Sequence, residues 1–215
     1  MFKIVSLGDT CSIAWQKIEH EYRDEYLPFD WIKTSKMSTI NYLIGNQFNG
    51  FLDSLIFKGN SVKFPLDDQN DPLFIKNNKS PELSIYGNQY CTFYHDFTSN
   101  TLDSQLTLVR EKYYRRIKRF YYLLNSSNYP ILFVRNESNP NNITPSDVDN
   151  FINLINNINP SLNYQLTILL HNSKNKSYPL NDYHHEKVII YNDYHPFIDW
   201  QWSNINWSTI FSYVL

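Results

Sequence analysis

Short apolar runs alternate with amphipathic helical patterns along this chain of 215 residues. Apolar runs at 131–134, 166–170 and 188–191, and a shorter β-rich run at 4–7, predict strands. Between them, apolar residues spaced by three and four positions predict helices, the longest over 102–124. Strands that alternate with helices are typical of parallel pairing with helices on both faces of the sheet. The pattern therefore predicts an α/β fold, a three-layer αβα arrangement around a mainly parallel sheet.

One helix start is marked by its residue types. Thr144 followed by Pro145 and Asp147 is typical of a capped helix N-terminus. The apolar residues that follow at helical spacing are expected to be buried, namely Val148, Phe151, Ile152 and Ile155. A second helical pattern runs from Met37 to Phe51, with Gly45 as its weak point.

Residues 53–97 have a different character. Gly59-Asn60 and Gly87-Asn88 each stand between apolar runs, which is a hairpin signal. The stretch 67–81 is polar and contains proline, so a loop is expected there. We therefore predict a small antiparallel insertion within a single α/β domain over residues 1–215.

Ligands of parallel α/β sheets bind beyond the carboxyl ends of the strands. In this chain those ends supply residues 8–11, residues 135–137, His171 and residues 192–195. We expect a functional site to be built from these segments.

Among the residues at these strand ends, Cys11 is the candidate for a reactive group. It follows a strand and the turn that Gly8 allows, at the mouth of the helix indicated by Ile13 and Ala14. Thr10 or Ser12 is the expected cap of that helix. The helix dipole and unpaired backbone N–H groups favour thiolate over thiol, and the same groups can hold an oxyanion. The alternative is structural, because free cysteine is among the most buried residue types.

A catalytic thiol also needs a base and a group that orients the base. Spacing does not choose among the candidate bases, which are His95, His171, His184, His185 and His195. Asp96 adjoins His95, but neighbours in a strand point to opposite faces. Asp30 lies among aromatic rings and is either a cap or a site residue.

A row of cations follows the long predicted helix. Lys112, Arg115, Arg116 and Arg119 recur at helical steps on the side away from the apolar residues. Such a row is either a solvated face or a site for phosphate or carboxylate, because arginine suits bidentate oxyanion contacts. Arg135, after the 131–134 strand, is a further candidate for anion binding.

Composition excludes several classes of function. A formal net charge of −2 gives no general attraction to nucleic acid or to anionic membranes. No apolar run approaches the ~20 residues of a membrane span, and two cysteines form no disulfide framework, so a soluble cytoplasmic protein is expected. No glycine-rich phosphate loop and no zinc-ligand spacing is present, so no metal and no required cofactor are predicted.

Several motifs in the same order resemble one known family. They are S-L-G-D-T-C at 6–11, P-F-D-W at 28–31, H-D-F at 95–97, K-Y-Y-R-R-I-K-R-F at 112–120 and L-F-V-R at 132–135. The chain resembles an uncharacterised bacterial and viral family, a domain of unknown function labelled "putative papain-like cysteine peptidase". This resemblance implies Cys11 as nucleophile and His95 as general base, with Asp96 beside it.

The strand and helix rhythm also resembles that of SGNH hydrolases and of capsule-biosynthesis acetyltransferases with a cysteine after the first strand. Gly8-Asp9-Thr10-Cys11 is similar to the Gly-Asp-Ser block of the SGNH enzymes. That resemblance implies an orienting or oxyanion-stabilising role for Asp9 and for Asn136, which follows a strand.

Three functions remain open at this point. The first is a cysteine-dependent acyl-transfer enzyme, with Cys11 attacking a carbonyl, His95 moving the proton, and Asp30 or Asn136 orienting or stabilising. The second is an acyltransferase that modifies glycans or nucleotide sugars, with the cation row holding a phosphorylated donor such as coenzyme A. The third is a non-catalytic binding module in which Cys11 is only packed. A small-molecule, glycan or peptide substrate is expected, and the oligomeric state is not predicted.

Overall fold

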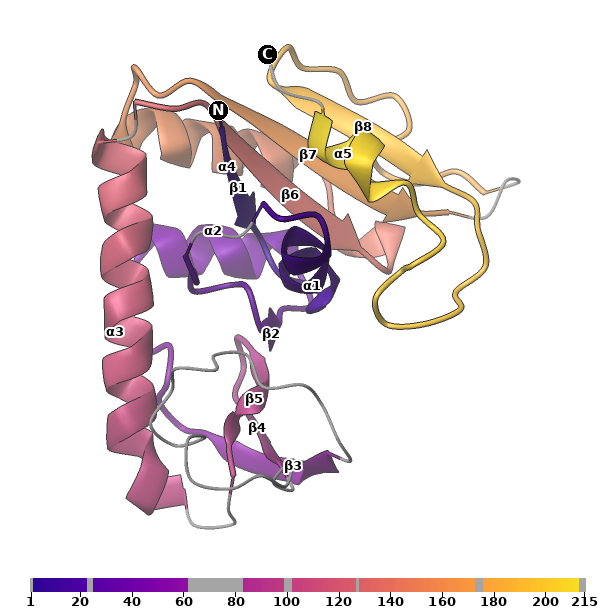
Figure 1. Cartoon of the computed structure of the whole chain (residues 1–215). Helices are drawn as coiled ribbons and strands as arrows, with labels where there is room; N and C mark the ends of the chain where they lie inside the picture. The colour runs from indigo at the N-terminus through magenta and orange to yellow at the C-terminus, as the bar shows by residue number, and fades with distance from the viewer. Residues whose placement is uncertain are drawn as a thin grey trace.

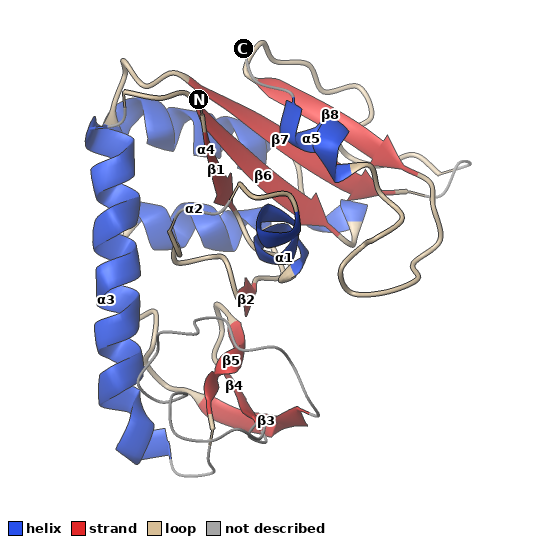
Figure 2. Cartoon of the chain, viewed as in Figure 1, coloured by secondary structure: helices blue, strands red, loops and turns tan. Residues whose placement is uncertain are grey.

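The computed structural model contains a parallel sheet and an antiparallel sheet (Figures 1 and 2). It describes residues 2–22, 25–61, 83–98, 102–126, 128–172 and 176–212. The parallel sheet has the order β1-β6-β7-β8, and every neighbouring pair is parallel. Its strands are β1 (Lys3–Ser6), β6 (Ile131–Glu137), β7 (Tyr164–His171) and β8 (Val188–Asp193).

Helices cover both faces of the parallel sheet, as the sequence predicts. The bounds are α1 (Ser12–Glu19), α2 (Met37–Gly45), α3 (Leu102–Ser126), α4 (Pro145–Ile158) and α5 (Trp207–Ser212). One apolar core joins the sheet to α2, α3 and α4, and a second joins its other face to α1 and α5. Figure 1 shows α1 and α5 on the near side of the sheet and α4 behind it. The predicted three-layer α/β fold is therefore confirmed.

The N-terminus of α4 shows why the sequence begins a helix there. Thr144 Oγ1 accepts a hydrogen bond from Asp147 N at 3.2 Å, and Asp147 Oδ2 accepts one from Thr144 N at 2.9 Å. This reciprocal capping satisfies backbone N–H groups that have no partner within the helix. The four apolar residues predicted for its buried face are all in the core. By contrast, α2 ends at Gly45, short of the predicted Phe51.

The antiparallel sheet has the order β2-β5-β4-β3. Its strands are β2 (Ile32–Lys33), β3 (Ile56–Ser61), β4 (Leu83–Gly87) and β5 (Thr92–Phe97). The predicted antiparallel insertion is confirmed, with β2 added from outside 53–97. Gly87-Asn88 does begin the turn between β4 and β5, where Asn88 Oδ1 accepts from Tyr90 N and Cys91 N.

The other hairpin prediction is wrong. Gly59-Asn60 lies inside β3, at an irregularity in the β3–β4 register between Phe57 and Gly59. Glycine suits such a bulge as well as it suits a turn, and sequence alone does not separate the two. The loop predicted at 67–81 lies outside the described residues.

One aromatic core connects the two sheets. Phe93 and Phe97 of β5, Tyr113 of α3, and Phe51, which follows α2, belong to the same buried cluster as the β1, β6 and β7 residues on that face. The Phe51 ring lies 5.4 Å from that of Phe93 and 5.1 Å from that of Tyr113. This packing holds β5 beside the remainder of the molecule.

A short 3-10 helix, η1 (Pro140–Asn142), follows β6. None of the helices described is long and apolar enough to cross a bilayer.

The turn after β1 allows a sharp test of the fold. Gly8 has φ +72°, and a Cβ there would lie 2.6 Å from Thr34 Oγ1. We expect Gly8→Ala to lower the free energy of unfolding by about 2–4 kcal/mol through strain and overpacking, measured by urea denaturation. Gly45→Ala is the control, because its Cβ would meet only Leu154 Cδ1 at 3.7 Å in a helix. It is expected to change stability by less than about 1 kcal/mol. Equal effects would contradict the close packing at Gly8.

Candidate functional site

Cys11 lies at the junction between β1 and α1. Gly8 and Asp9, with φ of 72° and 74°, turn the chain sharply after the strand. Cys11 is itself the N-cap residue of α1, and its carbonyl accepts a hydrogen bond from Trp15 N at 3.1 Å. The predicted capping by Thr10 or Ser12 is therefore wrong, since Ser12 is already the first helical residue. As the N-cap residue, Cys11 lies at the start of the helix, where N–H groups and the helix dipole favour negative charge.

His95 is the histidine that the structure brings to this thiol. Cys11 Sγ lies 3.4 Å from His95 Nε2, although the two residues are 84 positions apart. His95 comes from β5, and the edge of its ring packs near Trp31 with centroids 5.0 Å apart. The side chain of His95 is 1% exposed and Cys11 is 8% exposed. Burial and ring packing thus hold the imidazole in a fixed position against the sulfur.

A small cavity opens onto this pair. Its volume is about 130 Å³, and its walls are Thr10, Cys11, Lys33, Tyr94, His95 and Trp200. The Trp200 ring is held by an edge contact with Trp15, with centroids 5.6 Å apart. Sulfur and imidazole therefore face a space that a substrate group can enter.

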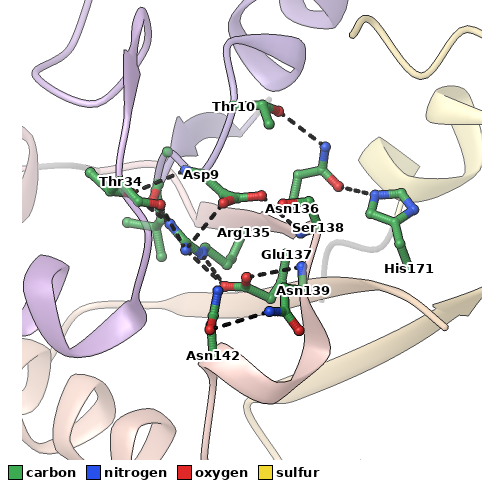
Figure 3. A network of polar contacts seen from close by, with 12 residues as sticks. Asp9, Thr10, Thr34, Arg135, Asn136, Glu137, Ser138, Asn139, Asn142 and His171 are labelled. Atoms are coloured by element: carbon green, nitrogen blue, oxygen red, sulfur yellow. Dashed lines mark hydrogen bonds and ion pairs between the residues drawn. The ribbon is translucent and has the colours of Figure 1, made fainter. Parts of the chain in front are cut away.

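The predicted anion-binding residue Arg135 is instead an internal brace (Figure 3). Its guanidinium donates to Glu137 Oε2 at 2.8 and 3.0 Å, to Leu7 O at 2.9 Å and to Thr34 Oγ1 at 2.7 Å. Arg135 and Glu137 are fully buried. Burial raises the pKa of Glu137 and the nearby Asp9 adds to this, while Arg135 opposes it. The guanidinium thus donates to acceptors of the protein itself, and it holds the end of β1 beside Thr34 and Glu137.

Asp9 belongs to the same brace. Its carboxylate accepts from Ser138 N at 2.8 Å and lies 3.8 Å from Arg135 Nη2. Its backbone N–H donates to Thr34 Oγ1 at 3.0 Å. These contacts fix the turn immediately before Thr10 and Cys11 (Figure 3).

A second polar group forms at the carboxyl ends of β6, β7 and β8. Asn136 Nδ2 donates to Ser12 Oγ at 2.7 Å and to Thr10 Oγ1 at 3.3 Å, and its Oδ1 meets His171 Nε2. His171 Nδ1 lies 2.8 Å from Asp193 Oδ2, and Asp193 Oδ1 bonds His195 Nδ1. The strand ends predicted to share an edge are therefore together, but their side-chain pairing could not be read from spacing.

The ionisable members of this group affect one another. Burial lowers the pKa of His171, although the hydrogen bond to Asp193 opposes that shift. Burial opposes ionisation of Asp193, but the hydrogen bonds from His195 and His171 outweigh it and lower the pKa of that carboxyl. Asp193 is consequently an anion at neutral pH.

The chain is similar to known proteins over most of its length. The model of the family described as "Putative papain-like cysteine peptidase (DUF1796)" matches residues 2–174. The chain belongs to this family. An uncharacterized protein of Acanthamoeba polyphaga mimivirus is 34% identical over 221 residues, which cover 96% of this chain and 95% of that protein. No solved structure matches. The family match includes Cys11, His95 and His171, whereas Asp193 lies beyond it.

The family description names a cysteine hydrolase type. Two carboxylates that the sequence offered as site residues, Asp96 and Asp30, contact other groups in the structure. Asp96 lies 2.6 Å from Lys112 Nζ and accepts from Tyr113 Oη at 3.1 Å, so it ties β5 to α3. Asp30 accepts from Leu27 N at 2.7 Å and lies 3.4 Å from Lys17 Nζ. Its contacts stabilise the loop at 27–30 against α1.

The row of cations on α3 is divided between the core and the surface. Lys112 and Arg116 are buried, Arg119 is half-buried and Arg115 is exposed. The Arg116 guanidinium lies 5.2 Å from the ring centres of Tyr26 and Tyr113. The prediction that the row faces away from the apolar side is wrong for the two buried cations.

The Arg135 brace generates a stability prediction. Arg135→Met leaves the buried Glu137 carboxylate without its partner, so we expect a loss of about 3–5 kcal/mol in the free energy of unfolding by urea titration. Arg110→Met is the matched control, because its ion pair with Asp53 is mostly exposed. It is expected to cost less than about 1 kcal/mol. A small effect at position 135 would show that the brace is dispensable.

Proposed function

We propose that this protein is a cysteine-dependent acyl-transfer enzyme that acts as a hydrolase. The observation that supports the proposal is the 3.4 Å contact between Cys11 Sγ and His95 Nε2 at the wall of a cavity. A nucleophile within hydrogen-bond reach of a fixed base is the arrangement that acyl transfer requires. The family's cysteine-peptidase description agrees with it.

The chemistry follows from this pair. His95 takes the thiol proton, Cys11 Sγ forms a bond to the carbonyl carbon, and the electron pair of the carbonyl moves to its oxygen. The oxyanion then reforms the carbonyl as the bond to the leaving group breaks, and His95 returns the proton to that group. In the second half, His95 takes a proton from water, the hydroxyl attacks the thioester, and the sulfur leaves as thiol. The products are a carboxylic acid and the protonated leaving group.

The size of the cavity limits the substrate. At about 130 Å³ it is well below the ~300–1,000 Å³ of pockets that enclose drug-sized ligands. We therefore expect the cavity to receive only a short acyl group or one side chain, between Tyr94 and Trp200. The remainder of a small-molecule, glycan or peptide substrate would lie outside, near Lys33, which is exposed at the rim.

The two other functions have less support. An acyltransferase with coenzyme A needs a phosphate site, but Lys112 pairs with Asp96 and Arg116 packs on tyrosine rings. A binding module in which Cys11 is only packed gives no reason for an imidazole at the sulfur. A thermal shift on addition of coenzyme A would favour the transferase, and we expect none.

Acylation by p-nitrophenyl acetate tests the proposal. We expect a burst of one p-nitrophenolate per chain and an acetyl group on Cys11 by mass spectrometry, both absent in Cys11→Ala. His95→Asn should slow the burst by about 10²–10⁴-fold, since it removes the base.

Cys91→Ser is the matched control. Cys91 is 3% exposed, and burial raises its pKa well above the usual range, so this thiol should remain unreactive. Labelling that persists in Cys11→Ala, or that disappears in Cys91→Ser, would contradict the assignment of the nucleophile.

A further inference from the structure

The cavity beside the sulfur and the imidazole has an apolar wall. Thr10 lies in this wall, but its hydroxyl oxygen already accepts from Ser12 N at 3.4 Å and from Asn136 Nδ2 at 3.3 Å. Lys33 is exposed, so its methylene stem lies in the wall while its ammonium group lies in solvent. Such a wall offers contact to carbon atoms and no hydrogen bond to a polar group.

An apolar wall determines which side of the reacting carbonyl enters the cavity. The carbonyl oxygen gains negative charge during the attack and requires hydrogen-bond donors. The hydrocarbon part of an acyl group requires only removal from water. A charged group would lose its hydration in the cavity without gaining a partner. The cavity therefore fits the carbon chain of the acyl group, while the carbonyl oxygen and the leaving group remain outside it.

The volume of the cavity limits the length of that chain. At about 130 Å³ it is slightly smaller than the ~150 Å³ of an engineered apolar cavity that binds benzene. The upper limit is therefore a chain of about six carbons, the number in benzene. A peptide fits less well, because its backbone continues from the α-carbon beside the side chain, and backbone N–H and C=O groups require partners.

Trp200 forms part of the cavity wall and is held by α1. Its ring makes an edge contact with the ring of Trp15, with centroids 5.6 Å apart. The carbonyl of the next residue, Gln201, accepts a hydrogen bond from Gln16 Nε2 at 2.9 Å. The helix that begins after Cys11 thus also fixes the indole ring that limits the cavity.

We propose that the substrate carries a short, straight and uncharged acyl group, which lies in the apolar cavity, and that Trp200 sets its maximum length. This inference rests on the proposed function, because the acyl group is the part of the substrate that Cys11 Sγ takes as a thioester when the leaving group departs. Trp200 is then a specificity-determining residue of this reaction.

A series of p-nitrophenyl esters of straight-chain acids tests the chain preference. Each acylation rate is divided by the rate of the same ester with β-mercaptoethanol, which removes differences in intrinsic reactivity. From acetate to butyrate we expect a rise of about fourfold per methylene group, the effect of burying one CH₂. Octanoate exceeds the cavity and should react no faster than butyrate. A flat series, or one that rises as far as octanoate, would contradict the proposal.

The esters of hexanoate and adipate test the exclusion of charge, because they differ only in a methyl or a carboxylate group at the chain end. We expect hexanoate to react faster by about tenfold or more, since the carboxylate would lose its hydration in the cavity. Faster reaction of adipate would show that the cavity selects an anion.

The p-nitrophenyl ester of N-acetylnorvaline separates an acyl chain from a peptide, because it carries a short apolar side chain beside an amide. It should react no faster than the acetate ester after the same normalisation. A rate above that of butyrate would identify a peptide substrate and overturn the proposal.

Two variants test the role of Trp200. In Trp200→Ala the wall recedes, so the ratio of the octanoate rate to the acetate rate should rise by about tenfold or more. Phe197→Ala is the matched control, because Phe197 is an aromatic residue close to Trp200 in the chain, is 64% exposed and lies outside the cavity wall. Its ratio should equal that of wild type. Equal ratios in both variants would show that Trp200 does not limit the chain.

A binding measurement decides the proposal independently of catalysis. Methyl propyl ketone and levulinate lack a leaving group and differ only in a methyl or a carboxylate group at the chain end. In ¹⁵N-labelled wild-type protein, the ketone should shift the indole N–H resonance of Trp200, which is assigned by its loss in Trp200→Phe, and levulinate should not. Equal shifts, or none with the ketone up to its solubility limit, would refute the acyl cavity. Absence of acylation by the acetate ester would instead refute the proposed function.

Discussion

The buried guanidinium of Arg135 is the contact on which the geometry of the site depends. It holds Leu7 O, at the end of β1, and both oxygens of Thr34, just after β2. Strand β2 pairs with β5, where Ile32 faces Phe93. One side chain thus connects the turn that carries Cys11 to the strand pair that carries His95. The same guanidinium also donates to the carboxylate of Glu137, which is fully buried.

This arrangement divides the work between the two sheets. The parallel sheet and α1 supply the sulfur and the N–H groups of a helix start, while the antiparallel sheet supplies the imidazole. Aromatic packing around Phe51, Phe93 and Tyr113 keeps the two parts in contact. Trp31 packs against the ring of His95, and Trp200 forms part of the cavity wall beside Cys11.

Local sequence patterns predicted the features that interactions between neighbouring residues determine. The apolar runs, the Thr144 cap and the position of Cys11 between a strand and a helix each depend on neighbours within a few residues. The strand ends could also be placed at one edge, because parallel pairing brings them there. The choice of His95 required the family resemblance, since nothing within a few residues of Cys11 or His95 specifies a contact across 84 positions.

The errors have the same origin. Lys112 and Arg116 have the pattern of a solvated helix face, but Asp96 of β5 and Tyr26, both outside the helix, provide partners that allow their burial. Arg135 resembled an anion-binding residue until Glu137 and Thr34 were seen to use its donors. The Asn136, His171 and Asp193 contacts were missed because side-chain pairing across three strands depends on strand register, which a single sequence leaves open.

The separation of sulfur and imidazole along the chain has a consequence for biosynthesis. Cys11 leaves the ribosome long before His95, which lies 84 positions later, and β5 must join the second sheet before the two atoms meet. Domains generally fold as units during synthesis. Until β5 is in place, the nascent polypeptide carries an ordinary thiol with no base beside it. The sulfur and the imidazole therefore come together only when the fold is complete.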